Sequence, residues 1–458
     1  MTSTSTQSGE AGPASNTDVV RPLRAPRRGP ADLPFHFAGR ALVEQLASER
    51  NEPVWLRDER LAASAAFEAL PVEANQLYTP YVDLRGASLD TARPYILDGP
   101  PGLGDDLRAP DLPPSVHVET MSQWLARDPA GFRATIEGGR TLPGDDKLAQ
   151  LARGSWSHGR HVEIPAGLAL AEPIVLRWPS AAPDRALITR TIVHVGVGAS
   201  ASIVEEQVPS GPVIACAEGE TVPQGFFHGT TEVLLGTGAS LAMASIQDFG
   251  PGQVVFQHRH ASIGEGATLH WALAQIGGRV VRSRVDNRLE GDRSSVEQVE
   301  IVFAGDQQLF DLTSYTRHIG RDTTGNLLSK GALLDQSKSF MKGLITIEKS
   351  AVGTDSFLGE FGMNLSKAAR AVAIPSLEID QPDCRRAAHS SSVGPIDPTQ
   401  LFYLESRGIA PDEARKFIVL GFLEPVVARV PLESARDRLR ELLEAKWAAG
   451  IEAAATAA

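Results

Sequence analysis

The sequence predicts a mainly β protein: a right-handed parallel β-helix, or a closely similar two-sheet solenoid, with helical N-terminal and C-terminal regions. First, a unit of strand, Gly-x-Gly-Ala turn and strand recurs at residues 193–204, 233–241 and 262–269. Second, the segments on either side carry apolar residues at helical spacing. Third, the aromatic content of 6% suits stacked aliphatic strands. An antiparallel sandwich is the alternative, because Gly-x-Gly turns occur there too.

We divide the chain into a disordered tail at residues 1–34, an N-terminal helical region at 35–155, a β-helix core at 156–385 and a C-terminal helical region at 386–458. The tail is rich in Ser, Thr, Gly and Pro, a composition typical of disorder. Its arginines would also suit an organelle transit peptide, but Glu10, Asp18 and the interspersed prolines favour a disordered tail.

Composition excludes several functional classes. A formal net charge of −12 without a long basic stripe argues against a nucleic-acid partner. Two cysteines, Cys216 and Cys384, cannot make a disulfide framework and indicate a reducing compartment. No apolar run reaches the length of a membrane span and no secretory signal is present, so we expect a cytoplasmic protein without a membrane partner. No P-loop motif occurs, so we expect no nucleotide bound by this chain.

Both flanking regions carry helix signals. In the N-terminal region, helices are expected at 41–46, 61–70, 121–125 and 147–151, with a loop at 97–104. In the C-terminal region, helices are expected at 399–406, 412–425 and 432–447, and Pro411 and Pro431 each precede one of them. The two last helices either pack on their own solenoid or dock a partner.

The junction at residues 376–408 separates the two architectures, because the apolar period changes there from 2 to 3.6. It carries His389, Cys384 and a cluster of charge. Any proposed function has to account for this stretch.

Four parts of the junction resemble one family signature: the strand at 377–379, His389, Ser-Val-Gly-Pro-Ile-Asp at 392–397 and Gln-Leu-Phe-Tyr-Leu-Glu-Ser-Arg-Gly-Ile at 400–409. Together they look like the C-terminal signature of the SufB/SufD family, whose members assemble iron–sulfur clusters. Residues 52–60 and 159–174 resemble other segments of that family. Ala387 and Ala388 stand where SufB-like sequences carry carboxylates, so the chain looks most like SufD.

The resemblance implies a non-catalytic scaffold subunit without catalytic residues of its own. It would pair through the β-helix with a SufB-like subunit, or with itself, and bind a SufC-like ATPase through its C-terminal helices in a SufBCD complex. A transient iron–sulfur cluster would be shared with the partner subunit, and His389 matches the histidine that contributes to it. The alternative within the family is the SufB-type scaffold subunit itself.

The chemistry of the junction agrees with a shared cluster. A neutral imidazole is a good iron ligand, and clusters need about four thiolate or imidazole donors. Two cysteines cannot supply them, so further ligands must come from a second subunit. The charges of Arg385 and Arg386 would favour the neutral form of His389. Cys384 could be a second metal ligand, although a buried thiol is the commoner role.

Other polar groups have structural interpretations beside functional ones. His258 and His260 lie on one face of a strand and could hold a metal, but structural histidines are commoner there. His318, with Arg317 and Asp322 nearby, could be an acid–base group or a polar contact between rungs.

A different class of function is a polysaccharide-cleaving β-helix enzyme, which would need a cluster of carboxylates. Asp286, Glu290 and Asp292 could form one. The missing secretion signal and the low aromatic content argue against this class.

Overall fold

The structure is a computed structural model that describes residues 33–104, 112–137, 142–211 and 223–457. It is a parallel β-solenoid with helices at both ends of the sequence, which confirms the predicted fold class and shows that the antiparallel sandwich was wrong. Residues 1–32 of the expected tail and Cys216 lie outside the described residues.

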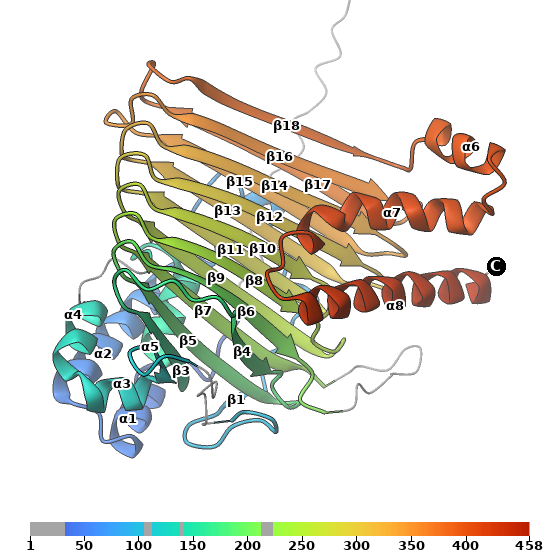
Figure 1. Ribbon diagram of the computed structural model, residues 1–458. Coiled ribbons are helices and arrows are strands. Elements are labelled where there is room, and N and C mark those ends of the chain that lie inside the picture. Colours follow the sequence, from blue (N-terminus) through green and yellow to red (C-terminus); the bar gives the residue numbers. More distant parts are fainter. Residues whose placement is uncertain (1–32, 105–111, 138–141, 212–222, 458) are drawn as a thin grey trace, which may run out of the picture.

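Sixteen of the strands make up the solenoid, and they alternate between its two sheets. They are β3 (His158–Ile164), β4 (Ile174–Pro179), β5 (Arg185–Val195), β6 (Ser200–Val208), β7 (Gly225–Leu235), β8 (Ser240–Gln247), β9 (Gln253–Ile263), β10 (Thr268–Gln275), β11 (Val280–Leu289), β12 (Ser295–Ala304), β13 (Leu309–His318), β14 (Thr324–Leu333), β15 (Lys338–Ile347), β16 (Asp355–Asn364), β17 (Arg370–Ile379) and β18 (Arg386–Gly394). Odd-numbered strands form a ten-stranded sheet with β1 (Arg93–Pro94) and β2 (His117–Thr120), and even-numbered strands form an eight-stranded sheet. All pairs are parallel except that of β2 with β3 (Figure 1).

The Gly-x-Gly-Ala turns stack on one another, as their recurrence predicts. Gly238 has φ 66°, a left-handed conformation that glycine adopts without steric cost, and its N–H donates to Glu265 O at 2.7 Å in the next turn. A Cβ on Gly264 would lie 2.6 Å from Leu235 O of the preceding turn. Glycine is therefore required by the close spacing of the rungs. The longer first interval between repeats comes from the β6–β7 connection, residues 209–224, much of it outside the described residues.

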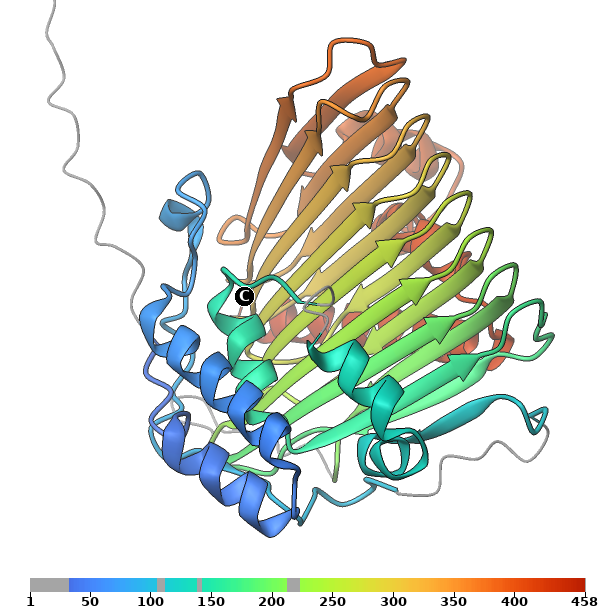
Figure 2. The same ribbon diagram turned by 90° about the vertical axis from the view of Figure 1, so that its left-hand side faces the viewer.

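The N-terminal region covers the outer face of the ten-stranded sheet (Figure 2). Its helices are α1 (Arg40–Glu49), α2 (Val54–Ala69), the 3₁₀ turn η1 (Thr79–Tyr81), α3 (Met121–Arg127), α4 (Pro129–Glu137) and α5 (Lys147–Ser155). Apolar side chains such as Phe67, Trp124 and Leu148 pack there against Ile188 and Phe256 of the sheet. The N-terminal region is therefore part of the same packed structure as the solenoid, because its helices bury apolar side chains of the ten-stranded sheet.

The C-terminal helices are α6 (Pro398–Ser406), α7 (Pro411–Val427) and α8 (Glu433–Ala457). Val419 and Leu423 of α7 and Leu439 of α8 are fully buried against the outer face of the eight-stranded sheet. Between the two alternatives stated above, α7 and α8 therefore pack on their own solenoid. Pro425 lies inside α7 and does not end it.

The solenoid extends beyond residue 385, where the sequence placed its boundary. Strand β18 occupies residues 386–394, and helices begin only at Pro398. Most of β18 consists of Ala and Ser, so it lacks the alternation of large apolar and polar groups by which a half-buried strand is recognised. The junction stretch thus contains the last rung of the solenoid.

Candidate functional site

The last rung leaves one end of the solenoid open. Strands β17 and β18 are the terminal strands of the two sheets, and each has one edge without a neighbour in the described part of the chain. No residue of β18 is fully buried, and Ile379 and Val393 remain 45% and 41% exposed. An uncovered edge of this length, with apolar side chains, is a template for another strand.

His389 lies near the middle of β18, opposite Leu358 of β16. Leu358 is fully buried inside the solenoid. Because residues paired in adjacent strands share a face of the sheet, His389 continues this inward-facing row. No rung follows, so its side chain is exposed. Among the described residues its imidazole has no hydrogen-bond or ion-pair partner, so it does not cap a strand by hydrogen bonding.

Cys384 lies in the turn between β17 and β18 and is half-buried. It packs beside the apolar cluster of Leu327, Ile345 and Leu358. His389 is three residues into β18, about 10 Å along the extended strand from its first residue. Cys384 and His389 both adjoin the cluster that contains Leu358, Cys384 from the turn and His389 from the strand.

Two arginines precede His389, and each is paired with a carboxylate. Arg385 contacts Asp322, and Arg386 Nη2 lies 2.6 Å from Asp355 Oδ1. Their positive charges are therefore largely compensated locally. Within the described ranges, no group of three or more His, Cys, Asp or Glu side chains could hold a metal ion. A cluster at this end would need donors from elsewhere.

Helix α6 projects away from the solenoid (Figure 1), and none of its residues is buried. Phe402 and Tyr403 are 70% and 56% exposed, and Phe417 in α7 is 57% exposed. Aromatic side chains of this kind are enriched in protein–protein interfaces.

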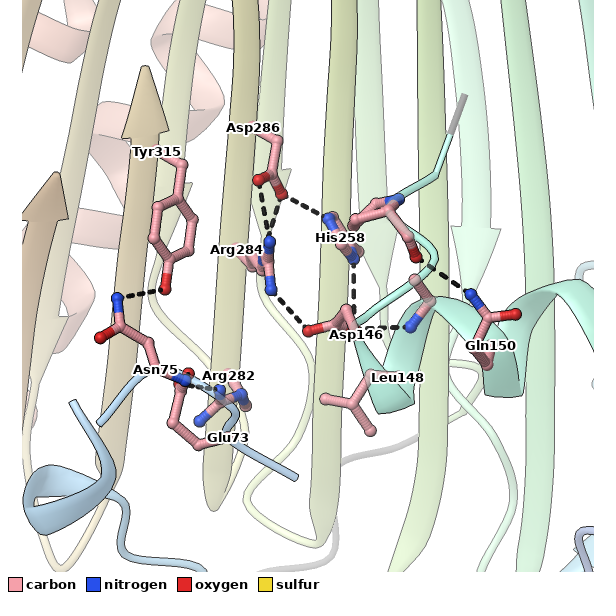
Figure 3. Close-up of polar contacts among 12 residues, drawn as sticks. Glu73, Asn75, Asp146, Leu148, Gln150, His258, Arg282, Arg284, Asp286 and Tyr315 are labelled. Carbon is pink, nitrogen blue, oxygen red and sulfur yellow. Dashed lines mark hydrogen bonds and ion pairs between the residues drawn. The ribbon is translucent and has the colours of Figure 1, made fainter. Parts of the chain in front are cut away.

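A second polar region lies on the outer face of the ten-stranded sheet, under the N-terminal region (Figure 3). His258 Nε2 lies 2.6 Å from Asp286 Oδ2, and Arg284 bridges Asp286 and Asp146. Asp146 is also the N-cap of α5, where it accepts from Ala149 N at 2.7 Å. Although burial alone would raise the pKa of Asp286, Arg284 and His258 hold it below its usual range. This network attaches α5 to the sheet.

His318 makes a contact between rungs, one of the two interpretations given above. Its Nδ1 lies 2.8 Å from Thr323 Oγ1 and its Nε2 lies 3.0 Å from Ser356 Oγ of β16. Arg317 pairs instead with Glu348, and Asp322 with Arg385. The acid–base group suggested by their proximity in sequence is therefore not formed.

The three carboxylates considered for sugar cleavage are occupied by other contacts. Asp286 is paired as described, Glu290 accepts from Arg288 Nε at 2.9 Å, and Asp292 accepts from Arg321 N at 2.8 Å. A glycosidase needs a carboxylic acid with a raised pKa, whereas the pKa of Asp286 is lowered by its partners.

Comparison with known proteins favours the iron–sulfur assembly family over a polysaccharide-cleaving enzyme. A family described as "SUF system FeS cluster assembly, SufBD core domain" matches residues 179–422. The chain belongs to this SufBD family. The match includes most of the solenoid, the last rung with His389, and helices α6 and most of α7.

Individual relatives agree with the SufBD assignment. The chain is 27% identical to the iron–sulfur cluster assembly protein SufD of Bacillus subtilis over 303 aligned residues. The alignment covers 66% of this chain and 67% of that relative. It is 31% identical over 348 residues to a SufBD family protein of Mycobacterium leprae, with 72% and 82% covered. A SufBD family protein of Mycobacterium tuberculosis is 32% identical over 227 residues, which span 48% of this chain and 57% of that relative.

The family and these relatives are named for iron–sulfur cluster assembly. No helix in the described ranges is long and apolar enough to cross a membrane. Sequence reasoning did not find the network around Asp146, because its members come from residues more than 100 positions apart. Only the position of Asp146 before a helix could have indicated its role as a cap.

Proposed function

We propose that this chain is the SufD-like subunit of an iron–sulfur cluster assembly scaffold. It pairs through the edge of β17 and β18 with a SufB-like subunit and binds a SufC-like ATPase through α6 and the start of α7. The complex builds and transfers a nascent cluster, which is cargo rather than a resident cofactor. The chain itself catalyses no reaction and binds no nucleotide.

The observation that carries this proposal is the position of His389. Its imidazole belongs to an inward-facing row, yet the solenoid ends there, so its nitrogen atoms face an end that a second subunit can cover. A neutral imidazole is a suitable iron ligand. The remaining donors come from the partner, since this chain brings no third ligand near His389 in its described part. Cys384 is the second candidate ligand on this chain.

Burial of the open end supports pairing. The exposed parts of Ile379 and Val393 would leave water when another terminal rung packs on β17 and β18. Full burial of such a side chain contributes about 1.5–3 kcal/mol, and less than half of each side chain remains to be buried here. The free edges would then gain strand neighbours. The alternatives are that this chain is itself the SufB-type scaffold subunit, or that two copies of it pair with each other.

The cluster role is tested by co-expressing the chain with SufB-like and SufC-like partners and measuring iron and sulfide in the purified complex. His389→Ala is expected to assemble normally and to lose most of the cluster, and Cys384→Ala tests the thiol in the same way. His270→Ala is the matched control, because His270 is also exposed on a strand of the eight-stranded sheet. A His389→Ala complex with the full iron and sulfide content would reject the ligand role.

The pairing surface is tested separately by size-exclusion chromatography. Ile379→Asp places a charge on the open end and is expected to abolish association with the SufB-like subunit. Val175→Asp is the control, since Val175 is 43% exposed on β4 at the opposite end. Equal loss in both variants would contradict the proposed surface, and a stable pair of this chain alone would favour the form in which two copies of the chain pair with each other.

A further inference from the structure

A cleft of about 860 Å³ opens on the outer face of the ten-stranded sheet, away from the open end of the solenoid. Residues 73–75 and 142–145 of the N-terminal region form its sides, and strands β9, β11, β13 and β15 form its floor. Its volume is within the range of small-molecule sites in proteins, 300–1,000 Å³ or so. We call it the outer cleft.

Two rows of side chains cross the floor of the outer cleft. His260, Asp286 and Tyr315 are in register on β9, β11 and β13. In the next row, Arg288 of β11 lies directly opposite Arg317 of β13. Two guanidinium groups on neighbouring positions of one face repel each other unless an anion lies between them.

Asp286 and Glu290, on the floor of the cleft, already have donors, whereas the exposed Asp145 at its side has no partner among the described residues. Asp286 accepts at both oxygens from Arg284 and at Oδ2 from His258. Glu290 accepts from Arg288 Nε at 2.9 Å and from Ser262 Oγ at 2.6 Å. The carboxylates on the floor of the cleft are thus occupied by protein donors.

The donors, by contrast, are only partly used. Arg288 and Arg317 each contact a carboxylate through Nε alone, and their terminal nitrogen atoms have no partner among the described residues. Burial raises the pKa of Tyr315 to about 12, so its hydroxyl keeps its proton, while the oxygen accepts from Asn75 Nδ2 at 3.3 Å. Guanidinium nitrogen atoms that are left without a hydrogen-bond acceptor fit an anionic ligand.

His260 gives an independent indication of a ligand. It is only 5% exposed, it lines the cleft, and neither ring nitrogen has a hydrogen-bond partner in the described part of the chain. Burial lowers the pKa of His260 to about 4, so the ring is neutral and offers one N–H donor. A buried polar group left without a partner costs about 1–3 kcal/mol, which a ligand would recover.

We propose that the outer cleft binds a small organic phosphate, whose phosphate group is held by Arg288, Arg317 and the imidazole of His260. A dianionic phosphate has enough acceptor oxygens for two guanidinium forks and an N–H group, and paired arginines suit this geometry. The remaining volume accommodates the body of the ligand beside the Tyr315 ring. This site lies outside the cluster-assembly role of the last rung and does not depend on it.

The test is isothermal titration of the full-length chain with inorganic pyrophosphate and inorganic phosphate at constant ionic strength, with citrate as the carboxylate probe. Arg288→Gln and Arg317→Gln are each expected to weaken pyrophosphate binding at least about tenfold, since each removes a charge-assisted hydrogen bond. Arg177→Gln is the matched control, because Arg177 is also a half-exposed strand arginine with a single carboxylate partner. It should bind as the wild type does.

The variant His260→Leu distinguishes a ligand-binding role of His260 from a purely structural one. The free variant is expected to be as stable as the wild type or more so, because an unpartnered buried imidazole is replaced by an apolar group. Its affinity for pyrophosphate should fall about tenfold or more. Thermal unfolding with and without pyrophosphate measures both effects.

Several results would overturn the proposal. Wild-type protein that shows no saturable pyrophosphate binding below about 1 mM has no phosphate site of the proposed kind. Equal weakening by Arg177→Gln would indicate non-specific anion binding. If citrate binds as tightly as pyrophosphate and its binding depends on the same arginines, the site does not select phosphate and the proposed phosphate ligand is rejected. Iron and sulfide contents are not read in this experiment, so its failure leaves the cluster proposal unaffected.

Discussion

His258 Nε2 of β9 lies 2.6 Å from Asp286 Oδ2 of β11, and the other side of the imidazole faces Asp146 of the N-terminal region (Figure 3). The sheet and its covering helix therefore share one buried carboxylate–imidazole–carboxylate arrangement, with Arg284 as the balancing charge.

Asp286→Ala is expected to destabilise the chain strongly. It removes the carboxylate hydrogen-bonded to His258 and one of the two carboxylates that pair with Arg284, so that Asp146 alone remains for both. Breaking a buried pair from one side costs about 3–5 kcal/mol. Asp98→Ala is the control, since Asp98 makes an exposed pair with Arg185, worth less than about 1 kcal/mol. Urea unfolding of both variants measures the difference, and similar losses would contradict the structural role of Asp286. Because its folded pKa is lowered, its contribution is present above about pH 4 and disappears as pH falls further.

Glu360→Gln is expected to flatten the pH dependence of stability. Burial raises the pKa of Glu360 to about 7, against the opposing effects of the Ile374 N–H and Lys342. Between its usual value near 4.5 and pH 7, the folded state holds a proton that the unfolded state has lost. Stability therefore falls as pH rises through this window, and the variant should be the more stable protein at pH 8.

Thermal unfolding at pH 5 and pH 8 measures this effect. Gln retains an oxygen that can accept from Ile374 N, so the hydrogen bond at 2.8 Å is preserved. Glu378→Gln, at an exposed position of β17, should leave the pH dependence unchanged. A wild-type curve that rises between pH 5 and pH 8, and a variant that follows it, would disprove the assignment.

Gly264→Ala is expected to destabilise the solenoid by about 1–3 kcal/mol, the usual cost of steric overpacking. Its Cβ would meet Leu235 O at 2.6 Å, and a backbone atom in a stacked turn cannot move without shifting the rung. Gly144→Ala is the control, as nothing lies within 4 Å of a Cβ there. Chemical denaturation compares the two, and an unaffected Gly264→Ala would show that the turns are less tightly stacked.

Replacing both Phe402 and Tyr403 by Ala is expected to weaken binding of a SufC-like ATPase at least about tenfold, since exposed aromatic side chains contribute strongly when a partner covers them. The thermal unfolding midpoint should stay unchanged, because neither ring is buried in this chain. Leu77→Ala, at a 59% exposed position of the N-terminal region, is the control for binding. If the double variant binds the ATPase as tightly as the wild type does, Phe402 and Tyr403 are not part of the docking surface.

The solenoid could be predicted from the sequence because the recurring Gly-x-Gly-Ala turns need glycine at the same positions. Gly238 supplies the left-handed backbone conformation, and Gly264 allows the close approach of the neighbouring turn. Strand β18 could not be predicted in this way, because its Ala and Ser residues do not show the alternation of apolar and polar side chains that is typical of a strand. His389 was found through the resemblance of its surroundings to a family, and its exposure at the end of an inward-facing row required coordinates. The contact of Asp146 with His258 spans more than 100 residues, and no local pattern encodes such a contact.

The two ends of the solenoid differ in a way that limits assembly. At the first rung the ten-stranded sheet ends in the short antiparallel β2, whereas at the last rung two long parallel strands, β17 and β18, stay uncovered. In the described chain, the first rung, made of β3 and β4, leaves only the six-residue β4 with a free edge, so the last rung offers the longer template for pairing. Two such chains that join through their last rungs would form a closed pair, so growth into a filament would stop after a single step.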